Sequence, residues 1–226
     1  MAVLKKKPIK LIILSFVLYF AVIIPAYAED VIEKRIAFDI EYGSATFTPF
    51  PLNDIGSKLY GKSISGTPFG GNFLLVLAPG VVIGFDYRTF NWGYDKGKYI
   101  DATTYVTKNR VDITQTSVYF DLSPFNLGSK TKNSIGNGIF VEIGPSMTDL
   151  KEQYIRSDTG AYSFTTTGYG LDIRFGYRTL TKEPLSFIAR VKVSVPVNSD
   201  NKESESGLKL NGAVTASVNL GLCLSF

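Results

Sequence analysis

Charged residues in this sequence recur at every second position, inside segments whose intervening residues are apolar. Asp172 and Arg174 are two residues apart, and so are Asp86 and Arg88. Successive side chains of a β-strand point to opposite faces, so each pair would share one face. A carboxylate beside a guanidinium can form an ion pair, transfer protons or line a polar passage. The same alternation selects ten charged residues: Asp39, Glu41, Asp86, Arg88, Asp121, Glu142, Asp172, Arg174, Arg190 and Lys192.

The composition excludes several of the chemistries that charged clusters perform. The chain has no histidine and one cysteine, Cys223. Histidine-based catalysis, histidine metal sites, cysteine-cluster zinc sites and intrachain disulfides are therefore excluded. A Ser–Lys or carboxylate pair is conceivable, but an ion pair explains Asp172 and Arg174 more simply. Gly168 and Gly170 stand inside a strand pattern without a following helix, which does not fit a phosphate loop. We expect no enzyme activity, no cofactor and no metal.

The segments that must position these charges alternate with a period of two. In 166–177 the odd positions from Tyr169 to Tyr177 are apolar or aromatic, whereas the even positions carry glycines and charges. Most such segments reach the roughly 9–11 residues that a transmembrane strand needs. Eight segments show the pattern, three of them weakly (70–77, 112–122 and 138–145), and the others are 35–43, 81–90, 166–177, 185–195 and 208–226. No helical stretch stands out among them, so the pattern predicts an all-β chain.

The connections between these segments alternate in length. Short turns are expected at 78–80 and 178–184. Long polar loops are expected at 48–69, 91–110, 146–165 and 196–207. Long loops at one end and short turns at the other are typical of outer-membrane barrels. The segment 123–137 is the exception, because it should be a short turn and has 15 residues.

Alternation alone leaves two kinds of barrel open. A soluble lipocalin-like barrel has its apolar side chains inside, whereas a membrane barrel has them outside. The terminal strand favours the membrane, because every second residue is apolar and the last is aromatic: Val218, Leu220, Leu222, Leu224 and Phe226. In this strand the sequence resembles the small outer-membrane β-barrels, the OmpA/OmpX/OmpW-like group. The resemblance implies that the barrel-assembly machinery recognises Leu220, Leu222, Leu224 and Phe226.

Aromatic and glycine positions also favour the membrane barrel. Aromatic residues at both rims of the barrel would form the girdles typical of membrane interfaces. One rim would hold Phe38, Phe120, Tyr177, Phe187 and Phe226, and the other would hold Tyr42, Tyr87, Phe90 and Tyr169. The glycines of the strands fall mainly on the charged face, where a narrow barrel has least room.

The N-terminal segment resembles a secretory signal. Lys5, Lys6, Lys7 and Lys10 precede an apolar run of about 14 residues, which is short for a membrane span. Ala26 and Ala28 then form a small-x-small cleavage site, so we expect residues 1–28 to be removed and 29–226 to form one barrel domain. The remaining residues are equally rich in acidic and basic side chains. The basic pI therefore belongs to the leader, and a nucleic-acid partner is not expected.

These observations predict a closed, antiparallel, up-and-down transmembrane β-barrel of eight strands. Its interior would be plugged by ion pairs, because an eight-stranded barrel has room only for its own side chains; a narrow or gated polar passage is the alternative. We expect a structural or surface-interaction role through long extracellular loops, with a small-solute channel as alternative and a soluble lipid carrier as a weaker one.

The location and partners follow from the same prediction. We expect a monomer in the outer membrane of a Gram-negative (diderm) bacterium. Its partners would be outer-membrane lipids and lipopolysaccharide, and during biogenesis the assembly machinery and periplasmic chaperones. The loops 91–110 and 146–165 combine aromatic residues with lysines and arginines. They would either bind glycans, lipopolysaccharide phosphates or host proteins, or extend the upper aromatic girdle.

Overall fold

The strands of this chain close into a barrel. The computed structural model describes residues 36–49, 52–78, 81–94, 97–121, 138–179, 185–199 and 202–225. The elements in these ranges are β1 (Ile36–Thr48), α2 (Asp54–Tyr60), β2 (Ile64–Ala78), β3 (Val81–Tyr94), β4 (Lys98–Tyr99), β5 (Tyr105–Asp121), β6 (Gly138–Arg156), β7 (Gly160–Arg178), β8 (Leu185–Ser199) and β9 (Val214–Ser225). Among the helices in these ranges, none has the length and apolar character needed to cross a membrane.

Eight of the strands form the wall, and every neighbouring pair is antiparallel. The order is β3-β2-β1-β9-β8-β7-β6-β5, and β3 also pairs with β5, which closes the ring. The two-residue strand β4 pairs only with the start of β5. Closure leaves each wall strand with a neighbour on both sides over most of its length. The predicted closed barrel of eight strands is therefore confirmed.

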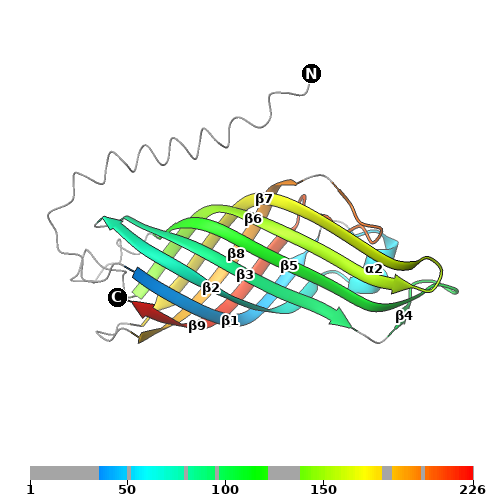
Figure 1. The fold of residues 1–226 in the computed structure, drawn as a ribbon, viewed down its shortest axis with the longest axis horizontal. Helices are drawn as coiled ribbons and strands as arrows, with labels where there is room; N and C mark the ends of the chain where they lie inside the picture. The colour runs from blue at the N-terminus through cyan, green and yellow to red at the C-terminus, as the bar shows by residue number, and fades with distance from the viewer. Residues whose placement is uncertain are drawn as a thin grey trace, which may run out of the picture.

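The barrel is elongated, and its two ends differ (Figure 1). The helix α2 and β4 lie at one end, here called the α2 end, while β9 finishes at the opposite end. The strands reach far toward the α2 end: β6 and β7 have 19 residues each. Transmembrane strands need only about 9–11 residues, so these two strands are longer than a bilayer crossing requires.

Two predicted loops are largely strand. The expected loop 146–165 is wrong, because β6 and β7 run through it and meet at the turn 157–159. The expected loop 91–110 contains the end of β3, all of β4 and the start of β5. The alternation of buried and exposed residues continues there. The outward residues become polar, so that both segments resemble polar loops in sequence.

The other predicted boundaries also shift. The expected loop 48–69 contains α2 and the first residues of β2, and β8 extends into 196–207. The final strand begins at Val214, so Leu208 and Leu210 do not belong to it. Both leucines are fully buried instead of lying on an outer face. The problematic segment 123–137 lies outside the described residues.

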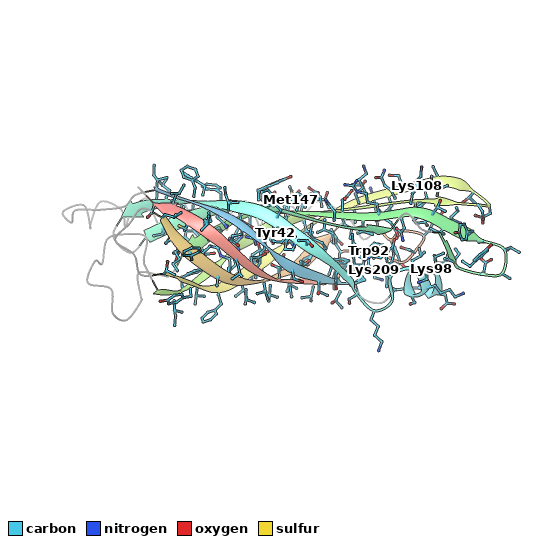
Figure 2. All side chains as sticks on the ribbon, turned by 90° about the horizontal axis from the view of Figure 1, so that it is seen from below. Tyr42, Trp92, Lys98, Lys108, Met147 and Lys209 are labelled. Carbon is cyan, nitrogen blue, oxygen red and sulfur yellow. The ribbon has the colours of Figure 1, made fainter. Side chains whose placement is uncertain are left out.

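The polarity of the outer and inner faces of the wall changes along the length of the barrel. Toward the opposite end, large apolar side chains are exposed on the outside, forming what we call the apolar belt. The belt includes Phe38, Ile40, Tyr42, Phe69, Phe85, Tyr87, Ile139, Val141, Ile143, Tyr169, Leu171, Ile173, Phe175, Tyr177, Leu185, Phe187, Val191, Leu220, Leu222 and Leu224. Figure 2 shows Tyr42 and Met147 about midway along the barrel, and Lys98 and Lys108 toward the α2 end.

Beyond the belt the outer face is mainly polar and the inner face is mainly apolar. On β1, the outward residues after Tyr42 are Ser44, Thr46 and Thr48, whereas Phe47 is buried inside. On β6, Lys151 is exposed and Leu150 is buried. An apolar outside suits contact with lipid, and a polar outside suits water. The soluble-barrel alternative does not fit the belt, because there the charged residues are inside.

Candidate functional site

The interior of the belt region holds one connected set of ion pairs, here called the interior network. All ten charged residues predicted to share one face lie in it, and none is more than 2% exposed. Arg178 joins them, which gives eleven residues in a single network. They come from β1, β3, β5, β6, β7 and β8. Residues far apart in the sequence therefore meet at the barrel axis.

Two carboxylates are the centres of this network. Glu142 on β6 lies 3.6 Å from Arg174, 3.2 Å from Arg178 and 3.0 Å from Arg190. Asp86 on β3 lies 3.0 Å from Arg88, 3.1 Å from Arg174 and 2.9 Å from Lys192. Arg174 contacts both carboxylates and so connects the ion pairs around Glu142 with those around Asp86.

The remaining ion pairs complete the network. Asp172 contacts Arg174 at 3.2 Å and Lys192 at 2.9 Å. Asp121 pairs with Arg178 at 3.0 Å. Asp39 and Glu41 both pair with Arg190, and Glu41 also lies 2.9 Å from Arg88. Buried charges need such partners, because an unpaired charge away from water is costly.

Aromatic rings support the arginines from the wall. The guanidinium of Arg174 lies 4.0 Å from the ring centroid of Tyr119, and that of Arg178 lies 4.3 Å from the centroid of Phe140. Such cation–π contacts are favourable where the cation is desolvated. A glycine lies across from each ring: a Cβ at Gly84 would come within 2.1 Å of Tyr119, and one at Gly176 within 2.3 Å of Phe140. Glycine is required at both positions to leave room for the ring.

Sequence reasoning missed two members of this site. Arg178 was assigned to a turn, although it continues the even-numbered series of Asp172 and Arg174 on β7. Asn72 lies on β2 and received no role; its amide donates to Glu41 at 3.0 Å, and its oxygen accepts from Tyr119 at 3.3 Å. Extending the strand pattern by one more even position would have found Arg178. No sequence signal singles out Asn72.

The network contains six carboxylates and five cations. Each of its carboxylates contacts at least one cation. Asp172 and Arg174, the pair considered for chemistry, contact each other and further network members. Within the described residues, no three His, Cys, Asp or Glu side chains are grouped so as to hold a metal ion.

A second, apolar layer fills the barrel at the α2 end. We call it the α2-end cluster; its buried residues are Ala45, Phe47, Leu59, Tyr60, Ile64, Phe90, Ile100, Val106, Val111, Ile113, Leu150, Tyr154, Leu208, Leu210 and Ala213. Two segments outside the wall contribute to it: α2 gives Leu59 and Tyr60, and 202–213 gives Leu208 and Leu210. The predicted outer-girdle position of Phe90 is wrong, because the wall there is beyond the belt and Phe90 packs inside.

One asparagine joins the two segments. Asn53 is the N-cap of α2, and its side-chain oxygen accepts from the Gly56 backbone N–H at 3.0 Å. Its side-chain amide donates to the Glu205 carbonyl at 2.8 Å. An N-cap satisfies a backbone donor that the first helical turn leaves unpaired. Asn53 therefore stabilises the start of α2 and attaches it to 202–213.

The aromatic residues of the predicted loops mostly pack inward. Trp92, Tyr162 and Phe164 contact the α2-end cluster, and Tyr154 belongs to it. The rings of Tyr154 and Tyr162 stack with centroids 4.7 Å apart. Four basic residues of these two loops are exposed on the outside: Lys98, Lys108, Arg110 and Lys151. The aromatic residues thus stabilise the α2 end, and the cations face solvent.

The predicted assembly and export signals are only partly described. Leu220, Leu222 and Leu224 point outward on β9 and are 66%, 46% and 44% exposed. Phe226, Ala26 and Ala28 lie outside the described residues, as does all of 1–28. Recognition by the assembly machinery and cleavage after Ala28 stay predictions.

Comparisons with known proteins match the fold rather than the sequence. No protein-family model matches the chain, and no curated protein matches its sequence. The structure of Ail, the attachment invasion locus protein of Yersinia pestis, superposes with a TM-score of 0.50 at 11% identity, over 86% of this chain and 100% of Ail. A second Ail structure, in complex with the heparin analogue sucrose octasulfate, gives the same values.

A further solved structure, Neisserial surface protein A, gives a TM-score of 0.49 at 11% identity, over 84% of this chain and 97% of that one. The strand order, the ring closure and the likeness to Ail agree on one architecture. The chain therefore has the same closed eight-stranded antiparallel barrel fold as Ail.

Proposed function

We propose that this chain is an integral outer-membrane β-barrel protein whose interior is closed and whose α2 end is the working surface. The observation that carries the proposal is the change of sides along the wall. In the belt, apolar residues such as Ile40 and Leu222 face outward and charged residues face inward. Beyond the belt, the outward side chains are mainly polar and the inward side chains are mainly apolar. One region is thus suited to lipid and the other to water.

Two layers of side chains support a closed interior. The interior network occupies the belt region, and the α2-end cluster fills the barrel above it. An eight-stranded barrel has little space beyond its own side chains. In this proposal the chain is not an enzyme, because Asp172 and Arg174 pair with each other and with neighbouring charges. Activity would then reside at the surface of the α2 end.

The proposed location implies partners for the outer face. Exposed hydroxyl-bearing residues directly beyond the belt, including Ser44, Ser65 and Thr67, would meet headgroups and lipopolysaccharide sugars. Lys151 and Arg110 would meet lipopolysaccharide phosphates. Export by the signal segment, and insertion by the assembly machinery with periplasmic chaperones, complete the proposal. We propose a monomer, since each of the eight wall strands, as far as the structure describes them, pairs with a strand on both sides.

Conductance tests the closed interior. We expect residues 29–226, folded into planar bilayers, to give no stepwise current. A matched variant, Arg174→Ala with Lys192→Ala, removes two large interior side chains and should raise leakage if the network closes the passage. Regular current steps from the unmodified chain would instead support the second candidate function, a small-solute channel.

One feature favours that second candidate. Small polar side chains line the interior between the two layers. Ser194 lies across from Asp172 of the network, Thr215 lies across from Phe47 of the cluster, and Ser194 and Thr215 are paired with each other. A hydroxyl-lined zone of this kind suits water and small solutes. Conduction would then require α2 and 202–213 to move away from the barrel mouth.

A further inference from the structure

Glu152 is a buried carboxylate that joins both segments of the α2 end to the wall. It lies on β6, beyond the belt, and is fully buried. Its Oε1 accepts a hydrogen bond from the Tyr60 hydroxyl of α2. The same atom accepts from the Ser206 hydroxyl of 202–213 at 2.6 Å. One carboxyl group therefore holds a helix and a loop that are separate in sequence.

No cation faces this carboxyl group among the described residues. The titratable groups around it are Tyr60 on α2, Tyr154 on β6, Tyr162 on β7 and Glu205 on 202–213. Its polar neighbours are Asn109 on β5, which accepts from Tyr60 at 3.1 Å, and Ser204 and Ser206 on 202–213.

Two basic side chains of this end, Arg156 and Lys58, are engaged elsewhere. Arg156 pairs with Asp158 at 2.5 Å and with Glu205 at 3.3 Å. On α2, Lys58 donates to the backbone carbonyl of Ile100 at 2.7 Å. Glu152 therefore differs from the acids of the interior network, each of which contacts at least one cation.

The second oxygen of Glu152 indicates its state when the segments are docked. Oε2 is buried and has no hydrogen-bond partner among the described residues. An ionised carboxylate with an unpaired buried oxygen is costly, whereas a neutral carboxyl group can carry its proton there. Burial raises the pKa of Glu152, and the negative charge of Glu205 adds to this, while the hydroxyl donors oppose it.

We propose that Glu152 is a pH-sensitive latch, which in its neutral form holds α2 and 202–213 in the barrel mouth and on ionisation releases them. The docked group binds its proton more tightly than the same group in water would. Docking is therefore strongest below the ordinary range of a glutamate and weakens as the pH rises through the raised pKa. The latch lies outside the belt, and it would act on the mouth whether or not the interior conducts.

The single tryptophan of the chain provides a probe of this movement. Trp92 lies on β3, and its ring meets that of Tyr60 edge-on with centroids 5.2 Å apart. Release of α2 would uncover this ring. Acrylamide quenching of Trp92 fluorescence, measured on the folded chain in detergent micelles from about pH 4 to about pH 9, should rise in a single titration step. Heat-modifiable migration in gels reports that the barrel stays folded throughout.

Two variants identify the titrating group. Glu152→Gln keeps the shape and the acceptor oxygen but cannot ionise, so quenching should stay low at every pH. Glu205→Gln removes the neighbouring exposed carboxylate and should keep the step, moved to lower pH because a charge that opposes ionisation is gone. A step that persists unchanged in Glu152→Gln, or one that disappears in Glu205→Gln, would overturn the proposal.

Hydrogen exchange provides a measurement on the unmodified chain. After correction for the intrinsic pH dependence of exchange, residues 54–60 and 202–213 should lose protection together as the pH rises. The strands β8 and β9 should keep theirs. Constant protection of both segments across the range would overturn the latch and would leave the closed-barrel proposal to be decided by conductance.

Discussion

At the scale of single residues, the interior is organised by arginines that each satisfy carboxylates from different strands. Arg178 pairs with Asp121 of β5 and Glu142 of β6, and Arg190 pairs with acids of β1 and β6. The planar guanidinium has five donors in a fixed arrangement, which lets one side chain serve several acceptors. The network holds the strands in register through these shared acceptors.

Replacing Arg178 tests how strongly the network depends on each cation. Arg178→Gln removes a cation from Asp121 and another from Glu142, in a network that already has more acids than bases. We expect the free energy of unfolding to fall by about 3–5 kcal/mol. Urea unfolding in lipid vesicles, followed by gel migration, measures it.

Arg110 provides the matched control. It lies on the outside beyond the belt, its side chain is 58% exposed, and it pairs with Asp112 at 2.7 Å. Surface pairs contribute about 0–1 kcal/mol, so Arg110→Gln should change stability little. Equal losses from the two variants would mean that the interior pairs are as weak as solvated ones.

At the scale of elements, the β6–β7 hairpin is the largest departure from the predicted loops. In the sheet register, Lys151 lies across from Asp112 of β5 on one side and from Thr165 of β7 on the other. Its backbone therefore has a neighbouring strand on each side. The chain reverses only at 157–159, directly after Arg156. A paired strand must open before a protease can bind it, whereas a turn is accessible.

Limited trypsin digestion distinguishes the hairpin from a loop. In the folded chain in detergent micelles, we expect cleavage after Arg156 to precede cleavage after Lys151. Mass spectrometry of early fragments identifies the site, and Arg156→Gln should remove the early cut. Early cleavage after Lys151 would instead indicate that 146–165 is an accessible loop, as the sequence predicted.

At the scale of the whole molecule, the change of sides predicts which part of the wall contacts lipid in the proposed membrane location. Leu222 lies outward within the belt, across from Ile40 and Phe187. Thr48 lies outward beyond the belt, at the end of β1 next to Val214. The two positions face the same way and differ in the solvent that they meet.

Introducing a charge at these two positions tests the assignment. Leu222→Arg should cost up to about 2–4 kcal/mol, because an arginine near the middle of a bilayer is poorly solvated. Thr48→Arg should be close to neutral. The readout is the free energy of unfolding in lipid vesicles. A tolerated arginine at 222 together with a costly one at 48 would place the lipid at the other end of the barrel.

Period-two alternation is a local property. Together with the terminal strand and the aromatic positions, it was sufficient to predict the eight strands, the closed barrel and the inward face of Asp39, Glu142 and Arg174. Each of these follows from which side chains share a face. The strand ends did not follow, because beyond the belt the outward side chains change from apolar to polar while the period of two continues.

The tertiary structure alone decided which residues meet inside the barrel. Glu142 contacts Arg190 across the barrel interior, and Glu152 binds Tyr60 and Ser206 from segments 92 and 54 residues away. Ring closure and the stagger of the strands set these distances, and neither is encoded in a short stretch of sequence. The sequence thus determined the architecture of the wall, whereas closure of the ring determined the contacts that could close, hold or open its interior.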